Sequence, residues 1–549
     1  ETHTILNIEN IIGSLNHENT LRGNSLDNTI IGGDKDDTLS GGAGTNYLDG
    51  RDGINTVDYS RANNNVTVDL SKTGIQEVYL DGSTTAKDTL KNIQNVIGSN
   101  NKDIIAGNSQ NNSLFGGLGD DTFIGSGGDD ILNGGDGIDV VSYASATENL
   151  YIDLGVTTPV SIGTGYGTDT FISIEGAIGG SGNDTIKGTS GSNVLIGGDG
   201  DDTLLPNGNN GMIDELDYID GGTGTDFVSF NFGGNSDVTL DLANSGIQNT
   251  GKGRVQIVNI ENVEGGAGND RLYGNSSDNT LSGLAGDDIL VGRAGNNTLD
   301  GGADFDTADY SGVDSLNGIN VNLGLSTQQV QNNGYVGKDT LINIEKIIAT
   351  KNNDYIDATR TNTNQMTFEL GEGNDTIFAG SGANVIYTSR MSESGTDYSS
   401  YNNTVFSGTG SDTVYGSSGN DTFVVSASDA LGSTGNDTFN GLSGADAIDY
   451  SLVIDTDANG ATGGINVTLS GTNDVYIALS GGNTNTIKNV SHIIGTGNND
   501  ILRGDNFNNI LDGGAGNDTI FGTAGNNTLS GGSGNDSITG GTGVDTIYG

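Results

Sequence analysis

The sequence predicts an all-β solenoid, and three observations lead to that fold class. Nine-residue blocks that open with Gly recur in register along most of the chain. Each block carries Asp or Asn at its sixth position and an apolar residue at its eighth. The 549 residues include 94 Gly but only 2 Pro and no Cys, which excludes collagen, Pro-rich linkers and a disulfide framework.

The nine-residue period is clearest over residues 98–142, which read GSNNKDIIA, GNSQNNSLF, GGLGDDTFI, GSGGDDILN and GGDGIDVVS. Gly at the first, second and fourth positions permits a tight six-residue turn with inward-facing carbonyl groups. The last three residues then form a short strand, and stacked eighth-position side chains build a narrow core. The frame starts again at Gly265 and Gly495, and two blocks make one 18-residue turn. Core residues expected from this frame include Leu272, Leu281, Leu290 and Leu299.

A longer repeat contains several blocks. It opens with an apolar-rich stretch such as IENIIG (8–13) or IQNVIG (93–98), and a VDYS-like strand followed by a VTVDL-like strand closes it. No segment has a strong helical period. The chain begins and ends inside such a module, as expected for a piece of a longer array. The expected modules are 1–60, 61–144, 145–230, 231–311, an enlarged 312–451 with an irregular insertion at 388–435, and 452–549.

The blocks GGLGDDTFI, GGAGNDTIF (513–521) and GGSGNDSIT (531–539) resemble GGxGxDxUx, the repeat of the RTX (hemolysin-type calcium-binding) family. This resemblance implies a parallel β-roll, Ca²⁺ between neighbouring turns and secretion through a type I pathway. The longer module is similar to the R-modules attached to mannuronan C-5 epimerases. That second likeness concerns an accessory module and not a catalytic domain.

Calcium should lie where two sixth-position Asp residues stand 18 residues apart, because Ca²⁺ takes six to eight oxygens from carboxylates and carbonyls. Pairs with this spacing are Asp103/Asp121, Asp121/Asp139, Asp184/Asp202, Asp270/Asp288, Asp288/Asp306, Asp500/Asp518 and Asp518/Asp536. The full set of candidate metal ligands is Asp37, Asp103, Asp121, Asp130, Asp139, Asp184, Asp202, Asp226, Asp270, Asp288, Asp306, Asp375, Asp412, Asp421, Asp437, Asp446, Asp500, Asp518, Asp536 and Asp545.

Asp and Asn alternate at the sixth position in the runs from Gly265 and Gly495. One edge of the roll should therefore carry Asp and calcium, and the other a ladder of Asn side chains. Asn side chains can hydrogen-bond along a stack without a metal. This arrangement departs from rolls with calcium on both edges. Asp130 and Asp545 break the alternation and would add sites on the second edge.

Charge and missing motifs exclude several functions. The net charge of −51 repels nucleic acid and anionic lipid, and no apolar run is long enough to cross a membrane. The chain shows no signal peptide, no G-x-S-x-G elbow with a His partner, no HExxH and no P-loop, so we expect no enzyme. DTDANG (455–460) begins like an EF-hand loop, with Asp455 and Asp457 as candidate ligands, but a polar turn is favoured.

The expected function is that of an extracellular structural protein on a bacterial surface, such as an S-layer, filament or adhesin-stalk component. It would fold when it binds many Ca²⁺ ions after secretion, and would associate with itself or with surface polysaccharide or outer-membrane protein. One alternative is a non-catalytic RTX region of a secreted polysaccharide-modifying enzyme, protease or toxin. Another is a glycan-binding module that uses 388–435, where Arg390, Tyr398 and Tyr401 lie.

Overall fold

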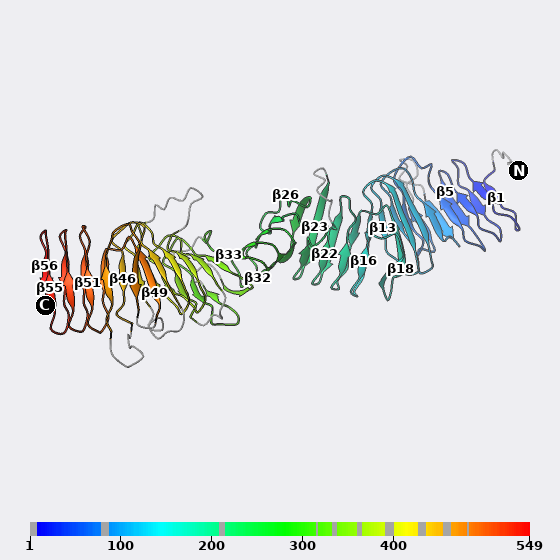
Figure 1. Cartoon of the computed structure of the whole chain (residues 1–549). Coiled ribbons are helices and arrows are strands. Elements are labelled where there is room, and N and C mark those ends of the chain that lie inside the picture. Colours follow the sequence, from blue (N-terminus) through cyan, green and yellow to red (C-terminus); the bar gives the residue numbers. More distant parts are fainter. Residues whose placement is uncertain are drawn as a thin grey trace. The chain divides into compact units, whose positions relative to one another are not determined.

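The computed structural model describes residues 8–77, 87–207, 215–313, 317–331, 337–359, 365–389, 400–425, 435–453, 463–479 and 482–549. The chain divides into two compact units, Glu1–Ala267 and Gly268–Gly549. All regular secondary structure in these ranges is β-strand. The described residues contain no helix that is long and apolar enough to cross a membrane. Figure 1 shows short strands running across each unit, one turn after another.

The first unit contains stacks of short strands joined by tight turns. One sheet has β2 (Thr20–Arg22), β4 (Thr38–Ser40), β6 (Thr56–Asp58), β10 (Asn95–Ile97), β12 (Ser113–Leu118), β14 (Ile131–Asp136), β18 (Gly167–Ile172) and β17 (Val160–Gly163). A second has β7 (Thr67–Asp69), β11 (Ile104–Ala106), β13 (Thr122–Ile124), β15 (Val140–Ser142), β19 (Gly176–Ile178), β21 (Val194–Asp199), β23 (Leu216–Thr223), β27 (Arg254–Val258) and β26 (Ile247–Asn249). The remaining strands are β1 (Asn10–Ile12), β3 (Thr29–Ile31), β5 (Thr45–Asp49), β9 (Lys87–Lys91) and β8 (Ile75–Glu77), then β16 (Tyr151–Asp153), β20 (Thr185–Lys187), β22 (Thr203–Leu205), β24 (Phe227–Ser229), β28 (Asn262–Gly266) and β25 (Thr239–Asp241).

The second unit is built in the same way. One stack has β30 (Thr280–Ala285), β32 (Thr298–Ala303), β36 (Lys338–Ile342), β35 (Val330–Gln331), β34 (Asn320–Asn322), β38 (Tyr355–Asp357), β40 (Thr376–Phe378), β42 (Thr404–Phe406), β44 (Thr422–Val424), β46 (Ala447–Asp449), β50 (His492–Ile494), β52 (Ile510–Asp512), β54 (Thr528–Ser530) and β56 (Thr546–Tyr548). Another has β29 (Arg271–Tyr273), β31 (Ile289–Val291), β33 (Thr307–Asp309), β37 (Lys346–Ile348), β39 (Thr367–Glu369), β41 (Val385–Tyr387), β43 (Thr413–Tyr415), β45 (Thr438–Asn440), β49 (Thr484–Lys488) and β48 (Val475–Ala478). A short sheet has β47 (Asn466–Thr468), β51 (Ile501–Arg503), β53 (Thr519–Phe521) and β55 (Ser537–Thr539).

Strands one 18-residue turn apart pair in parallel, as the period predicts. In the first unit β10 pairs with β12 and β12 with β14, which places Val96 beside Leu114 and Leu114 beside Leu132. In the second unit β30 pairs with β32, so Leu281 lies beside Leu299. The fold is therefore an all-β parallel β-roll.

The core is a column of eighth-position side chains, and the expected core residues are confirmed. Leu272, Leu281, Leu290 and Leu299 are all 0% exposed. One large side chain per block suffices, because each stacked residue covers the next. Stacking therefore gives a low-hydrophobicity chain a continuous apolar interior.

In three of the longer repeats the VTVDL-like strand pairs with a strand of the following turns. β7 pairs in parallel with β11, β34 with β38 and β47 with β51. The structure adds antiparallel pairings that the sequence did not predict: β8 with β9, β17 with β18, β26 with β27, β34 with β35, β35 with β36, and β48 with β49. The six-module division itself stays a prediction.

Candidate metal centre

The six-residue turn is shaped by glycines that approach the neighbouring turn. Gly117, at the second position of its block, has φ +122°, a conformation that side chains with a Cβ rarely adopt. A Cβ on Gly117 would collide with the carbonyl oxygen of Ser99 in the preceding turn. The turns therefore stack closely, with backbone carbonyl groups beside the sixth-position side chains.

Sixth-position Asp residues on one edge form a continuous buried stack, which we call the Asp column. In the first unit it contains Asp103, Asp121 and Asp139, each at most 1% exposed. The amide of Asp103 donates to Asp121 Oδ1 at 2.6 Å, and that of Asp121 donates to Asp139 Oδ1 at 2.7 Å. We call each stacked residue a rung. One carboxylate oxygen of each rung therefore accepts the backbone amide of the rung before it.

The same column recurs in other modules, and it brings together every predicted pair. Backbone-to-carboxylate bonds of 2.6–3.0 Å join Asp184 to Asp202, Asp270 to Asp288, Asp288 to Asp306, Asp500 to Asp518 and Asp518 to Asp536. Asp202 likewise bonds to Asp226, and Asp421 to Asp446. The enlarged module departs from the all-Asp rule, because Asn403 stands between Asp375 and Asp421.

The second carboxylate oxygen, Oδ2, has different surroundings from Oδ1 in many of these rungs. Several Asp-column residues have a buried Oδ2 with no hydrogen-bond donor within the described part of the chain. They are Asp121, Asp139, Asp202, Asp226, Asp288, Asp306, Asp375, Asp446 and Asp518. A buried, unpartnered carboxylate oxygen is costly, so it must meet a proton or a cation.

The surroundings of this oxygen fit a hard cation. A Cβ built on Gly116 would collide with Asp121 Oδ2 and lie 2.7 Å from the carbonyl oxygen of Gly134 in the next turn. The same cradle occurs at Gly283, between Asp288 Oδ2 and the carbonyl of Gly301. Carboxylate and carbonyl oxygens facing one point are the donor set that Ca²⁺ prefers.

Carbonyl oxygens are a necessary part of any such site. No three acidic or His side chains converge on one point among the residues that the structure describes. Two carboxylates from adjacent rungs therefore have to be completed by backbone oxygens. This explains why the glycines, which bring the turns close, matter as much as the Asp residues.

Burial and like charge hold these carboxyl groups away from their ordinary ionisation. Burial, assisted by the charges of Asp103 and Asp139, raises the pKa of Asp121 to about 7. In the second unit burial and the charges of Asp270 and Asp306 raise the pKa of Asp288 to about 8. Without a bound cation the column holds protons at a pH where an ordinary Asp has lost them.

The other edge carries the Asn column, a stack of sixth-position residues that are mostly Asn. Here a side-chain amide oxygen accepts the backbone amide of the preceding rung. Asn279 donates its backbone amide to Asn297 Oδ1, and Asn509 donates to Asn527 Oδ1, at 3.0 and 2.9 Å. The predicted hydrogen-bonded Asn ladder is thus confirmed, although Asp rungs make the same backbone bond. The Asn527 Nδ2 donates to the carbonyls of Gly522, Ala524 and Gly525 and to Asp545 Oδ1, at 3.1–3.4 Å.

Three Asp residues in the Asn column have protein donors for their second oxygen. Asp130 Oδ2 accepts from the Ser126 hydroxyl at 2.9 Å. Asp169, the next rung, accepts from the Tyr143 hydroxyl at 2.6 Å. Asp37 Oδ2 accepts from the amide of Gly33 at 2.5 Å. Asp130 therefore joins the Asn column as predicted, but its second oxygen is already occupied.

Two further departures concern the enlarged module and the last turn. Asp412 and Asp437 are adjacent rungs that follow Asn384, so two Asp residues replace Asn in this column. Asp545 follows Asn527 and is only half-buried. The rule of one Asp edge and one Asn edge therefore holds for the regular turns and breaks down in 312–451.

Sequence reasoning missed several residues of both columns. Asp354 is a buried rung that bonds to Asp375 at 2.8 Å, and burial raises its pKa to about 7. Its block opens with Ala349 in place of Gly, which hid the frame. Glu175 and Glu345 also cap Asp columns, accepting the amides of Asp139 and Asp306 at 3.0 Å.

A second, exposed ladder was also missed. The fifth-position Oδ1 of Asn353 accepts the amide of Asn374, and Asn374 accepts that of Asn402, both at 2.8 Å. The signal was the Asp or Asn that commonly stands immediately before the sixth position. Asp455 and Asp457 of the EF-hand-like segment lie outside the described residues, as do Arg390 and Tyr398.

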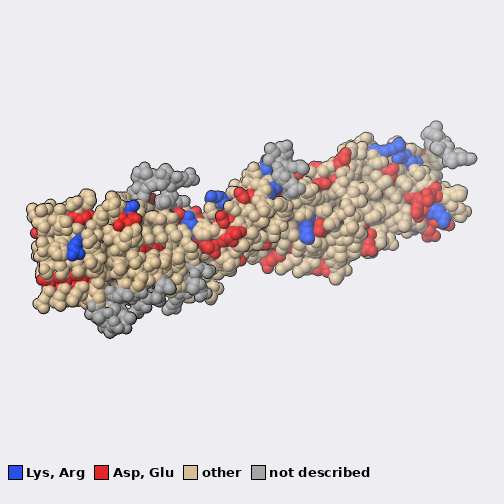
Figure 2. Space-filling view, viewed as in Figure 1, with Lys and Arg blue, Asp and Glu red and all other residues tan. Residues whose placement is uncertain are grey.

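Burial of the columns also explains the outer surface. On the face drawn in Figure 2, residues other than Asp, Glu, Lys and Arg predominate, and the acidic residues form separate patches. The chain nevertheless contains 71 Asp and Glu residues. Many Asp side chains, among them those of the Asp columns, are instead buried beside the backbone carbonyls.

Two of the comparisons with known proteins say little about this chain. No curated protein is similar to the chain in sequence. One solved structure with some similarity is a hyperactive, Ca²⁺-dependent, β-helical antifreeze protein from an Antarctic bacterium, with 11% identity over 96% of this chain and 86% of that chain. Its TM-score is 0.09, so the two chains do not superpose as wholes and its activity says nothing about this one.

The model of the RTX calcium-binding nonapeptide repeat matches the chain many times. The matches are residues 22–57, 97–132, 106–141, 178–213, 259–290, 273–308, 367–390, 397–427, 430–456, 494–529 and 521–549. RTX repeats bind multiple Ca²⁺ ions, and proteins that contain them are typically secreted by the type I route. With this repeat matched over more than half of its residues, the chain belongs to the RTX calcium-binding nonapeptide repeat family.

Proposed function

We propose that this protein is a calcium-stabilised structural component of a bacterial cell surface, which folds on binding Ca²⁺ after secretion. The observation that carries the proposal is the row of buried Oδ2 atoms without donors along the Asp columns. A structural array needs rigidity along its length, and these atoms recur at regular intervals. Bound calcium would supply the positive charge that lets neighbouring rungs stack.

The proposed calcium sites lie between adjacent Asp rungs. Asp103, Asp121 and Asp139 would hold ions in one module, and Asp270, Asp288 and Asp306 in another. Asp184, Asp202, Asp226, Asp375, Asp421, Asp446, Asp500, Asp518 and Asp536 complete the set on this edge. Asp412 and Asp437 form a further candidate pair. Asp37, Asp130 and Asp545 lie in the Asn column and complete the proposed ligands.

Folding by linkage follows from these sites. Binding only to the folded state stabilises it in proportion to the logarithm of ligand concentration, and many sites add their contributions. Extracellular modules bind with Kd on the order of 10⁻⁴–10⁻³ M, which suits the outside of the cell. In the metal-free chain the adjacent carboxylates repel one another, so the unfolded state is favoured.

Far-UV circular dichroism with Ca²⁺ and with EGTA tests this proposal. We expect strong β-signal in millimolar Ca²⁺ and its loss after chelation, with recovery when Ca²⁺ is restored. An unchanged spectrum in EGTA would defeat the proposal. Electron microscopy of the Ca²⁺-loaded chain tests the structural role, which predicts lattices or fibres. Monodisperse particles would instead favour an accessory region of a secreted enzyme or toxin.

A further inference from the structure

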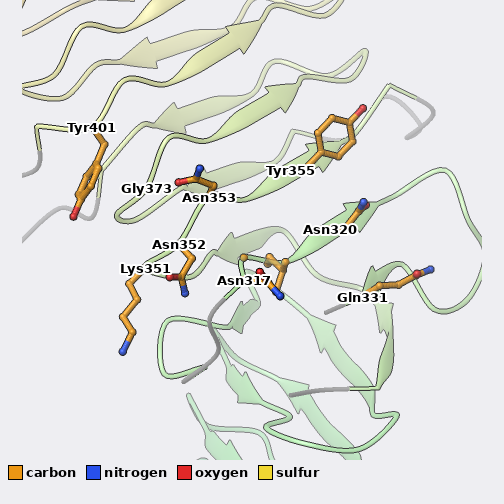
Figure 3. A pocket seen from close by; sticks show the side chains of 11 residues that line it. Asn317, Asn320, Gln331, Lys351, Asn352, Asn353, Tyr355, Gly373 and Tyr401 are labelled. Atoms are coloured by element: carbon orange, nitrogen blue, oxygen red, sulfur yellow. The ribbon is translucent and has the colours of Figure 1, made fainter. Parts of the chain in front are cut away.

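A cavity of about 740 Å³ opens in the enlarged module, beside the turn that carries Asp354. This volume falls within the range of small-molecule sites, roughly 300–1,000 Å³. Residues that line it include Asn320 and Gln331 from β34 and β35, Asn353 and Tyr355 around β38, and Tyr401. In Figure 3, Tyr401 and Tyr355 lie on opposite sides, with Asn352, Asn353 and Asn317 between them.

The chemistry of the lining is unusual for this chain. None of the described residues that line it is Asp or Glu, although the chain has 71 such residues. Four Asn, one Gln and two Tyr side chains supply most of its polar groups, and Lys351 supplies the positive charge. Amide groups both donate and accept hydrogen bonds, as sugar hydroxyls do. Tyrosine offers an apolar ring face with a polar tip, which suits the C–H face of a pyranose.

The fold presents these groups from three elements. Asn320 and Gln331 are directly paired in the antiparallel β34–β35 ladder, so their side chains lie on one face. Tyr355 heads a row of aromatic rings, 5.7 Å from Phe378, which stacks on Phe406 at 4.2 Å. This row extends the aromatic surface from the cavity onto the next turns of the roll.

Tyr401 is placed by the irregular turn of this module. Its neighbour Asn402 bonds to Asn374 across 28 residues, whereas regular turns bond across 18. The Tyr401 hydroxyl donates to Glu372 Oε2 at 3.4 Å, which orients the ring. The sequence irregularity around 388–435 therefore brings an aromatic side chain to the rim of a polar cavity.

We propose that this cavity binds a neutral oligosaccharide, with Tyr355 and Tyr401 contacting sugar rings and Asn320, Gln331 and Asn353 contacting hydroxyls. A neutral glycan is favoured over an anionic one because the chain carries a net charge of −51. The inference does not depend on lattice or fibre formation. A surface protein that binds glycan at this point would be attached to a polysaccharide layer.

A glycan array probed with the full Ca²⁺-loaded chain tests the proposal, followed by calorimetric titration of the best neutral oligosaccharide. We expect Y355A and Y401A each to weaken binding at least tenfold. N466A is the matched control, because β47 pairs with β51 as β34 pairs with β38. It should bind as the unmodified chain does. The midpoint of calcium-induced folding, measured for each variant, shows that the roll is intact.

Three results would overturn the proposal. They are the lack of any bound glycan, binding confined to uronate-containing glycans, and Y355A and Y401A variants that fold and bind normally. A second variant, Q331A, keeps the test decisive if either Tyr variant fails to fold. Gln331 lies on a two-residue strand and is only half-buried, so its truncation should spare the roll.

Discussion

The Asp column and the Asn column build the same turn with one atom exchanged, and they differ in what they need from solution. In both, Oδ1 accepts the amide of the preceding rung, as in Asp270–Asp288 and Asn279–Asn297. The second atom is an unpartnered oxygen at Asp288 and a donating nitrogen at Asn297. A side-chain amide therefore satisfies carbonyl oxygens that an Asp rung leaves facing a cation.

This contrast shows how the stacking of a roll can depend on cations while the register of its turns does not. In the regular turns the Asn column is satisfied without metal, so it holds the register of the turns on one edge. Asp-column residues such as Asp121 and Asp288 have a buried Oδ2 that only a cation or a proton can satisfy, so they decide whether the stack closes. A chain with Asp on both edges would repel itself more strongly before calcium arrived, because like charges would face each other on every turn.

The largest effect should come from D288N, which removes a carboxylate shared by two adjacent sites. In Ca²⁺ at about ten times Kd, each lost site costs about 1.4 kcal/mol, so the variant should lose about 3 kcal/mol. In EGTA the sign should reverse, since a buried like charge has been removed. Calcium-dependent thermal melts measure both values. A variant that is destabilised equally in both conditions would contradict the distinction between the columns.

A reciprocal change tests the Asn column. N527D replaces a nitrogen that donates to three backbone carbonyls with an oxygen that repels them. We expect a loss of about 1–3 kcal/mol in EGTA, the cost of unsatisfied buried groups. Calcium should recover part of that loss, because the new carboxylate stands next to Asp545. Equilibrium binding should then detect one additional ion, and recovery without added binding would argue against this reading.

Protons should partly replace calcium in the Asp column. The folded pKa values of Asp121 and Asp288, about 7 and 8, lie above the ordinary value of 3.8. Their protonation therefore stabilises the folded chain fully below pH 4, and that contribution is lost as pH rises through 7–8. In EGTA the β-signal should be stronger at pH 5 than at pH 8. In Ca²⁺ the trend should weaken or reverse, since protons compete for the same oxygens.

The nine-residue period of the sequence predicts the fold and most rungs of the two columns. It does so because the glycine turn and the buried eighth-position side chain recur in every block. It places Leu281 in the core and pairs Asp270 with Asp288 without knowledge of the structure. It fails where the frame is interrupted. Ala349 still permits the turn that Asp354 completes, and Glu175 reaches Asp139 from a different element. Such contacts depend on tertiary placement, which spacing along the chain does not encode.

The antiparallel strand pairs were also not predicted from the period, and three of them share a buried contact between Tyr and Asp. A buried Tyr hydroxyl meets an Asp carboxylate in Tyr59–Asp88, Tyr143–Asp169 and Tyr310–Asp339, at 2.6–3.1 Å. In the module where Phe230 replaces the Tyr, Val255 occupies the place of the Asp. In this module hydroxyl and carboxylate are lost together, as expected if each satisfies the other in an apolar interior, whereas a later module keeps Tyr450 with Asn485 at the Asp position.

The last test concerns this pairing on the Asn-column side. Y143F removes the hydroxyl that bonds to Asp169 Oδ2 and should cost about 1–3 kcal/mol, because it leaves a buried oxygen without its donor. The loss should be the same in Ca²⁺ and in EGTA, since Asp169 does not belong to the Asp column. The double variant Y143F/D169V, which copies Phe230 and Val255, should cost less than the sum of its single variants in a double-mutant cycle. Additive losses would mean that the two residues are buried side by side without stabilising each other. A calcium-dependent loss in Y143F would mean that the two columns are coupled through the core, and the metal-free edge could then no longer be treated as independent of the calcium edge.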